Sequence, residues 1–243
     1  MRDYEYEYCA RTDYIRSVVE KSGAAGIVYG NSGGKDSALV GILCKAACDD
    51  TVGIIMPCGA NRNYTTDTTD AMTVARQYGI ETRVVDLSAV RTAELQAIEG
   101  KCELKDNVCN NIAPRLRMTT LYAFAAAENR LVAGTGNRSE AYMGYFTKWG
   151  DGAHDFNPIA DLTVTEIYEF LTWLKAPEFL LKKAPSAGLF DGQTDEGEMG
   201  VTYKEIDRYL LTGKADKDLL AILQKYHARS EHKRRPISTF ENP

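Results

Sequence analysis

The segment 30–37 has the residue types of a loop that binds phosphate. It reads Gly-Asn-Ser-Gly-Gly-Lys-Asp-Ser and directly follows the short apolar run Gly-Ile-Val-Tyr. Glycines let the backbone bring its N–H groups close to an anion, and the N-terminus of a following helix adds a positive field. Ser32 and Ser37 add hydroxyl donors, whereas Asp36 would repel phosphate unless a bridging Mg²⁺ lay between them. A tight turn capped by serine and aspartate is the plain alternative.

Strands and helices alternate around this loop. Apolar runs predict buried strands at 26–29, 52–56, 82–86 and 131–133, and amphipathic patterns predict helices at 10–22, 37–47, 66–78, 87–99 and 107–129. Continuous apolar strands alternating with helices are typical of a parallel sheet covered on both faces. The sequence therefore predicts the α/β class, with a Rossmann-like doubly wound parallel sheet and, from residue 163, a helical C-terminal part. The stretch 183–200 predicts a long loop that, with 57–67, closes over a ligand as a lid.

Composition and charge restrict the possible partners. With 243 residues, 44% of them hydrophobic, the chain fits one large domain over 1–243. A net charge of -5 argues against a nucleic-acid partner, although residues 232–235, His-Lys-Arg-Arg, could form a local basic patch. No apolar run approaches the ~20 residues of a membrane helix. The first residues lack a secretory signal, so we expect a cytoplasmic protein whose six cysteines form no disulfides.

Several segments resemble known enzymes. The loop at 30–37 is similar to the Ser-Gly-Gly-x-Asp-Ser motif of the ATP pyrophosphatases, which adenylate a substrate and release pyrophosphate. Within that superfamily, the chain from about residue 10 to the C-terminus resembles the NAD synthetases. The segments that carry this resemblance, in chain order, are 111–118 (Asn-Ile-Ala-Pro-Arg-Leu-Arg-Met), 134–140 (Gly-Thr-Gly-Asn-Arg-Ser-Glu), 144–152, 155–158, 185–189, 195–196 and 231–234.

The resemblance implies a reaction in two steps. The carboxylate of nicotinic acid adenine dinucleotide attacks the α-phosphorus of ATP, which gives an adenylate and pyrophosphate. Ammonia then attacks the activated carbonyl, which gives NAD and AMP. Adenylation is needed because a free carboxylate is a poor acyl donor. The resemblance also implies Mg²⁺ as cofactor, ATP as co-substrate and a homodimer whose dinucleotide site lies at the subunit interface.

The same resemblance implies roles for individual residues. Asp36 and Glu140 correspond to Mg²⁺ ligands, and Asp155 and Lys148 to catalytic residues, with Asp155 a candidate acceptor of the ammonium proton. The expected ATP contacts are Gly30, Asn31, Ser32, Gly33, Gly34, Lys35, Asp36, Ser37, Thr135 and Ser186. The expected contacts to the substrate dinucleotide are Arg115, Lys148, Asp155, His232 and Lys233. The plain alternatives are surface cations for Arg115, Lys148 and the tail pair 232–233, a loop hydroxyl for Ser186 and a helix-start acid for Glu140.

Three positions depart from the NAD synthetase pattern. Val164 stands where the family often has a lysine that neutralises ATP phosphate, so either another cation replaces that charge or the enzyme is weak. Lys35 at the variable position of the loop is common in tRNA-thiolating relatives. His154 could tune Asp155 or be an exposed loop histidine. The candidate replacements for the missing charge are Lys35, Lys182 and Lys183.

Two other functions remain open on the same fold. A tRNA-thiolating enzyme would need sulphur-carrying cysteines, but Cys102 and Cys109 match no sulphur-relay spacing. A non-catalytic sensor of adenine nucleotides would not need Asp36, Glu140 and Asp155 together. Glutamine-dependent synthetases carry a large amidase domain, for which 243 residues leave no room. We therefore expect the ammonia to be free or to come from a separate glutaminase.

Overall fold

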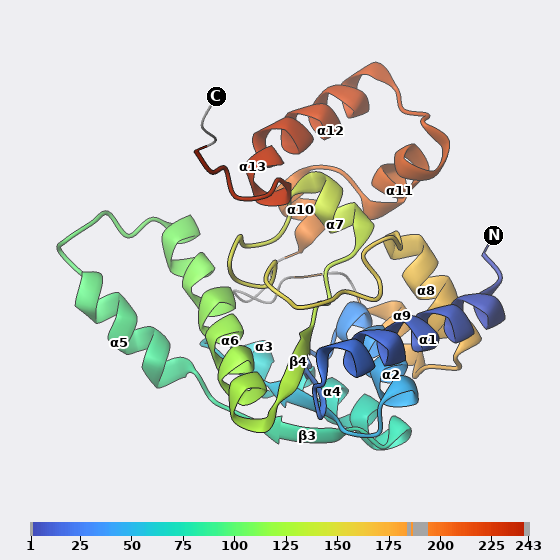
Figure 1. Cartoon of the computed structure of the whole chain (residues 1–243). Coiled ribbons are helices and arrows are strands. Elements are labelled where there is room, and N and C mark those ends of the chain that lie inside the picture. The colour runs from blue at the N-terminus through green and yellow to red at the C-terminus, as the bar shows by residue number, and fades with distance from the viewer. Residues whose placement is uncertain (1, 184–185, 187–193, 241–243) are drawn as a thin grey trace.

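A four-stranded parallel sheet forms the centre of the fold. The computed structural model describes residues 2–183, 186 and 194–240, apart from the side chains of residues 61 and 62 (Figure 1). The strands are β1 (Gly26–Gly30), β2 (Thr51–Ile55), β3 (Glu81–Val84) and β4 (Arg130–Ala133), in the spatial order β3-β2-β1-β4. All three pairings are parallel, and Val28 lies between Val52 and Val132. The predicted α/β class with a doubly wound parallel sheet is confirmed.

Helices cover both faces of this sheet, because successive side chains of a strand point to opposite sides. Ile27 and Tyr29 pack against one group of helices, whereas Val28 packs against α6 and its surroundings on the other face. The first group contains α1 (Tyr4–Ser22), α2 (Lys35–Ala47), α4 (Thr66–Tyr78), α8 (Val164–Trp173) and α9 (Glu178–Lys182). The second face holds α6 (Asp106–Glu128).

The largest differences from the predicted elements lie at the start of α1 and in the two predicted loops, of which the first, 57–67, contains the short helix α3 (Asn61–Tyr64). Helix α1 begins at Tyr4, six residues before the predicted start at 10, because the Asp3 side chain accepts hydrogen bonds from the backbone N–H groups of Glu5 and Tyr6. The predicted long loop at 183–200 contains a short helix, α10 (Asp195–Met199), which Thr194 caps. Residues 184–185 and 187–193 of that stretch lie outside the described residues.

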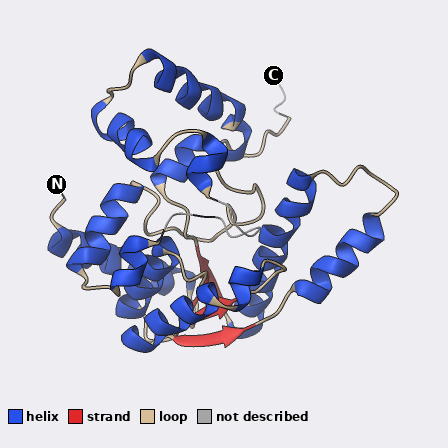
Figure 2. Ribbon diagram, turned by 180° about the vertical axis from the view of Figure 1, so that it is seen from behind, coloured by secondary structure: helices blue, strands red, loops and turns tan. Residues whose placement is uncertain are grey.

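The C-terminal part is helical, as the sequence predicts. Helices α7 (Arg138–Met143), α10, α11 (Tyr203–Thr212), α12 (Lys217–Arg229) and α13 (Glu231–Arg234) lie together above the carboxyl end of the sheet (Figures 1 and 2). Met143, Ile206 and Leu223 belong to a hydrophobic cluster of their own there. These five helices, called the C-terminal roof below, therefore cover the edge of the sheet at which the phosphate loop lies.

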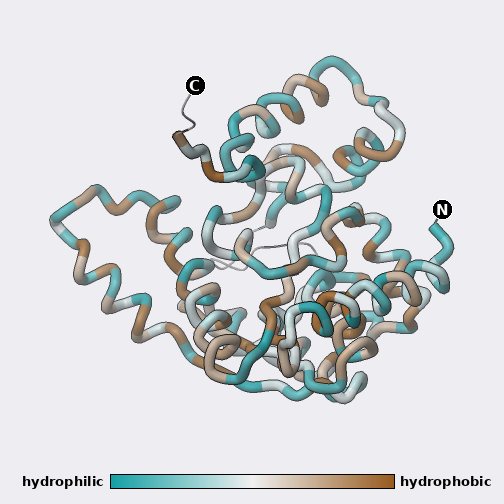
Figure 3. Tube along the Cα trace, viewed as in Figure 1, coloured by the Kyte–Doolittle hydropathy of each residue, from teal (hydrophilic) through white to brown (hydrophobic). Residues whose placement is uncertain are grey.

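An arm of two helices projects from the other side. Helix α5 (Ser88–Ile98) has no buried residue and packs beside the first half of α6, and the short α3 (Asn61–Tyr64) lies near its base. Figure 3 shows hydrophobic residues along this arm, and Val84 and Val90 at its root are about half exposed (50% and 49%). No helix among the described residues is both long and apolar enough to cross a bilayer.

Candidate active site

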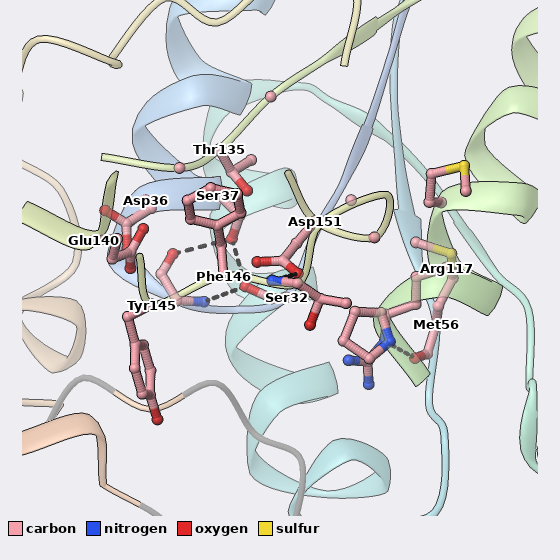
Figure 4. Close-up of a pocket in the computed structure, with 18 of the residues that line it drawn as sticks. Ser32, Asp36, Ser37, Met56, Arg117, Thr135, Glu140, Tyr145, Phe146 and Asp151 are labelled. Atoms are coloured by element: carbon pink, nitrogen blue, oxygen red, sulfur yellow. Dashed lines mark hydrogen bonds between the residues drawn. The ribbon is translucent and has the colours of Figure 1, made fainter. Parts of the chain in front are cut away.

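A cavity of about 470 Å³ opens at the carboxyl ends of the strands. Its walls come from the phosphate loop, the ends of β2 and β4, helix α6, the segment 144–153 and the C-terminal roof. In Figure 4, Asp36 and Glu140 lie at one end of the cavity and Arg117 beside Met56 at the other, with Ser32, Phe146 and Asp151 between them. Ligands of open parallel sheets bind at this edge, so this is the candidate active site.

The phosphate loop is held open toward the cavity. Gly33 has φ +71°, and the Ser32 and Ser37 hydroxyls lie 3.0 Å apart and bond to each other. The backbone N–H of Gly34 donates to the Ser32 hydroxyl at 3.3 Å, while no side chain caps the N-terminus of α2. The first N–H groups of α2 are therefore available to an anion. The predicted ATP contacts Gly30, Asn31, Ser32, Gly34, Lys35, Asp36 and Ser37 all line the cavity, and Gly33 lies between them.

Asn137 links Asp36 and Glu140, the two predicted metal ligands. These two carboxylates lie far apart in the sequence, and Asn137 forms hydrogen bonds to both residues. The Asn137 side-chain amide donates to Asp36 Oδ1 at 3.1 Å. Its carbonyl oxygen caps the backbone N–H of Glu140 at 2.9 Å, and the Glu140 carboxylate accepts the backbone N–H of Asn137 at 3.0 Å. Burial and the charge of Asp36 raise the pKa of Glu140 well above its usual value. Asn137 was missed by the sequence analysis, although the spacing Asn-x-x-Glu is the signature of a capping box.

These two carboxylates suit Mg²⁺ more than a metal held entirely by protein. No group of three histidine, cysteine or acidic side chains placed to hold a metal occurs in the part of the chain that the structure describes. Magnesium is usually held by one or two carboxylates together with water and substrate phosphates. The raised pKa of Glu140 also favours a cation at this place. Two carboxylates this close stay ionised together only when a positive charge lies beside them.

Lys35 already places one cation beside this pair. Its ammonium donates to Asp36 Oδ2 at 2.6 Å, and its side chain is 6% exposed. Burial alone would lower the pKa of Lys35, but the charges of Asp36 and Glu140 outweigh it and raise that pKa. Val164 is buried at the first turn of α8, where it offers no charge to the cavity.

The other two candidate cations have different surroundings. Lys183 lines the cavity, but its ammonium donates to Asp67 at 2.9 Å, to Asp70 at 2.6 Å and to the carbonyl of Gly33 at 3.1 Å. Lys182 is exposed and pairs with Glu178 on the outside of α9. Among the three candidates for the charge absent at Val164, Lys35 therefore lies nearest to the acidic pair.

Three residues predicted to bind the substrate dinucleotide form a chain of contacts outside the cavity. The Arg115 guanidinium donates to the carbonyl of Lys148 at 3.4 Å, and the Lys148 ammonium donates to the carbonyl of His232 at 2.7 Å. The same ammonium lies 5.4 Å from the centre of the exposed Trp149 ring. None of these side chains is among the described residues that line the cavity, so they form a surface patch beside its mouth.

Lys233 connects this patch to the interior. Its ammonium donates to the carbonyls of Gly144 and Phe146 at 2.7 and 2.6 Å, and its side chain lines the cavity. Thr135 and Ser186 line the cavity as well. The ATP contacts predicted from the sequence thus converge in one place, whereas only Lys233 among the predicted substrate contacts reaches that place.

Asp155 and Asp151 have different positions. Both oxygens of Asp155 are engaged at the edge of the sheet, where they accept from the Tyr122 hydroxyl (3.1 Å) and the backbone N–H of Val132 (2.8 Å). Asp151 is exposed on the wall of the cavity, and the backbone N–H of Thr147 donates to its carboxylate at 2.9 Å. Desolvation by the surrounding cavity walls raises the pKa of Asp151. The sequence predicted a role for Asp155, whereas Asp151 appeared only as part of the segment 144–152 and was assigned none.

Arg117 is a further cavity residue that the sequence analysis did not single out. Its guanidinium donates to the carbonyl of Met56 at 3.1 Å and to the side chain of Asn63 at 3.3 Å. Burial lowers its pKa. Arg115 and Arg117 lie two residues apart on α6, so they point to different sides of the helix. The sequence alone does not say which of the two faces the sheet.

Comparison with known proteins places the chain among synthetases. The family model described as NAD synthase matches residues 7–237. An NH(3)-dependent NAD(+) synthetase from Carboxydothermus hydrogenoformans is 46% identical over 226 residues, which cover 92% of each chain. Two solved structures are similar over nearly the whole chain. An NMN synthetase from Francisella tularensis has 35% identity, covers 100% of both chains and gives a TM-score of 0.94. An NH3-dependent NAD synthetase from Campylobacter jejuni, in complex with the nitrate ion, has 30% identity, covers 99% and 100%, and gives 0.82.

Proposed function

The chain belongs to the NAD synthase family, and on that premise we propose the substrates and the residues of its reaction. It is an ATP-dependent ligase, an NH3-dependent NAD⁺ synthetase, that joins ammonia to the carboxyl group of nicotinic acid adenine dinucleotide. The observation that carries this function is the cavity in which the phosphate loop and the Asp36–Glu140 pair lie together. Membership of this family leaves no support for the tRNA-thiolating alternative.

The residues of the loop receive the ATP phosphates. Backbone N–H groups at the start of α2 and the hydroxyls of Ser32 and Ser37 stabilise negative charge as the bond between the α- and β-phosphates breaks. Asp36 and Glu140 would hold Mg²⁺, which when bound neutralises the pyrophosphate leaving group. Thr135 and Ser186 line the same cavity and are proposed as further ATP contacts. Because the reaction consumes ATP and all six cysteines are free, we infer a cytoplasmic enzyme.

The surface patch of Arg115, Lys148 and His232 is proposed to hold the part of the substrate dinucleotide that projects from the cavity. Lys233 lines the cavity next to that patch, and Asp155 is proposed as a further substrate contact from the sheet edge. Arg115 and Lys148 of this patch are cations, and cations suit the pyrophosphate bridge of a dinucleotide.

A homodimer would enclose this open side of the site. The arm of α5 and α6 offers a face for the second subunit, because α5 buries no residue within its own chain and Val90 is half exposed. We expect light scattering to give twice the mass of the 26.9 kDa chain. A mass that stays at that of one chain at micromolar concentrations would contradict the dimer.

A second substrate is favoured by one comparison. The structure with the TM-score of 0.94 is that of an NMN synthetase, and it matches all of this chain. An enzyme of this specificity would amidate nicotinic acid mononucleotide by the same adenylation chemistry. It would not need a contact to the adenylate half of a dinucleotide, so the surface patch would contribute little.

One assay separates these possibilities. The purified chain is incubated with ATP, Mg²⁺ and ammonium, and with either nicotinic acid adenine dinucleotide or nicotinic acid mononucleotide at equal concentration. We expect NAD from the first substrate with the higher kcat/KM. A higher kcat/KM for the mononucleotide would identify an NMN synthetase, and no amide from either substrate would rule out the synthetase function. Release of pyrophosphate only on addition of tRNA would restore the thiolating alternative.

A further inference from the structure

Both oxygens of the Asp36 carboxylate are already occupied by protein donors. Oδ1 accepts the side-chain amide of Asn137 at 3.1 Å, and Oδ2 accepts the Lys35 ammonium at 2.6 Å. A metal ion that binds Asp36 must therefore displace one of these donors or share an oxygen with it. The Asn137 amide is fixed by the cap of α7, since the same side chain holds the backbone of Glu140. The Lys35 ammonium, at the end of a flexible side chain, is the donor that can move.

The Lys35 side chain is almost completely buried and lines the cavity. The residue is 7% exposed, and its ammonium lies 6.0 Å from the centre of the Tyr168 ring and 5.6 Å from that of Tyr203. The Tyr203 hydroxyl is itself held by Asp195, at 3.0 Å. An ammonium that leaves Asp36 must consequently find another acceptor inside the cavity, and the phosphates of bound ATP would be the nearest new anions.

We propose that Lys35 is an internal counter-ion that occupies Asp36 before substrates bind and transfers to an ATP phosphate when the metal takes its place. This inference rests on the proposed function, because it assumes that Asp36 binds the metal of ATP. It assigns Lys35 a positioning role with two consequences. The enzyme binds divalent metal weakly without nucleotide, and metal and ATP enter the site together.

The physical reason is competition between two cations for one carboxylate oxygen. A divalent ion that approaches Asp36 while the ammonium is still there meets strong repulsion, since a partly buried site screens charges poorly. Bound phosphate removes the repulsion by offering the ammonium a charge-assisted hydrogen bond of comparable strength. Removal of the ammonium should therefore strengthen metal binding and weaken ATP binding, two changes of opposite sign.

The test measures binding and needs no turnover. Mn²⁺ affinity is measured by electron paramagnetic resonance for the wild-type chain, Lys35→Met and Lys182→Met, without nucleotide. We expect Lys35→Met to bind Mn²⁺ about tenfold more tightly than wild type, the scale on which a neighbouring charge acts in such a site. Lys182→Met is the matched control, because it removes an exposed lysine that pairs outside the cavity, and its Mn²⁺ affinity should equal that of wild type.

The second arm measures nucleotide. Calorimetric affinity for α,β-methylene ATP in saturating Mg²⁺ should fall about tenfold in Lys35→Met, as expected for the loss of one hydrogen bond to a charged group. Unchanged or weaker Mn²⁺ binding in Lys35→Met would overturn the inference, whatever happens to the nucleotide. If that variant does not fold, Lys35→Gln, which keeps a donor without the charge, repeats both measurements. A chain that binds Mn²⁺ as expected but forms no amide would refute the proposed function and leave the counter-ion intact.

Discussion

Replacing Gly33 with alanine is expected to abolish useful ATP binding, with a loss of affinity of about 100-fold or more. Two independent costs add at this position. The residue has φ +71°, a region that a side chain with a Cβ enters only with strain. A Cβ at Gly33 would also lie 2.2 Å from the carbonyl oxygen of Asp67 and 3.1 Å from the backbone nitrogen of Ala71. Both neighbours belong to the backbone of α4, which cannot rotate away, so the loop itself must move.

The neighbouring glycine supplies a matched control. Gly34 has φ -94°, and a Cβ there would meet only the Ser32 hydroxyl, at 3.3 Å. Gly34→Ala should therefore retain ATP binding within about fivefold of wild type, because a single side-chain rotation relieves the contact. Calorimetry with α,β-methylene ATP measures both variants, and thermal melting followed by circular dichroism checks that each is folded. Similar affinities for the two variants would mean that the shape of the loop at Gly33 does not govern phosphate binding.

Replacing Asp151 with asparagine is expected to slow formation of the amide by about 100-fold or more, the usual contribution of a general base. Attack on the adenylate needs neutral ammonia, and the proton lost from ammonium needs an acceptor inside the cavity. Asp151 is open to that cavity, whereas both oxygens of Asp155 are engaged at the sheet edge. Because desolvation by the cavity walls raises the pKa of Asp151, its carboxylate is a stronger base than an ordinary aspartate. We therefore propose Asp151 as the acceptor in place of the role predicted for Asp155.

The two aspartates can be distinguished by following both products. Asp151→Asn should still release pyrophosphate in a first turnover but form little amide, since adenylation precedes the proton transfer. In wild type the amidation rate at a fixed ammonium concentration should be level above the raised pKa of Asp151 and fall as the pH drops through it, because that carboxylate becomes protonated. In the variant the rate should follow the free-ammonia concentration, with no inflection at that pKa. Asp155→Asn should keep the inflection and change mainly the KM of the substrate. The reverse pattern would return the proton transfer to Asp155.

Much of the site was accessible from the sequence because strand ends gather at one edge of a parallel sheet. Asp36 follows β1 and Glu140 follows β4, two neighbouring strands, so their meeting is a consequence of topology. Helix α4 and its terminal Gly79 also lie where the periodicity and the cap predict them. In these cases a local pattern and a general rule of the fold agree.

The remainder of the site depends on packing that no local pattern encodes. Asp151 and Asp155 lie four residues apart in a segment of turns, and Asp155 is fixed to the sheet edge by the bridge between Ala133 and Phe156 and by hydrogen bonds to the backbone of Val132. Arg115 and Arg117 share one helix, and which of them enters the cavity is decided by how α6 lies on the sheet. The start of α1 was predicted too late because its first turns alternate tyrosine and glutamate and carry no apolar stripe.

The contacts of Lys183 have a consequence for how the molecule opens and closes locally. Its ammonium holds the carbonyl of Gly33, 150 positions away in the sequence, together with two aspartates of α4. Detachment of the end of α9 would therefore release the phosphate loop and remove the Lys183 ammonium from Asp67 and Asp70. In hydrogen exchange, the loop, the first turn of α4 and the end of α9 should behave as one cooperative unit. Ligand bound at the loop would then protect backbone amides that it never touches.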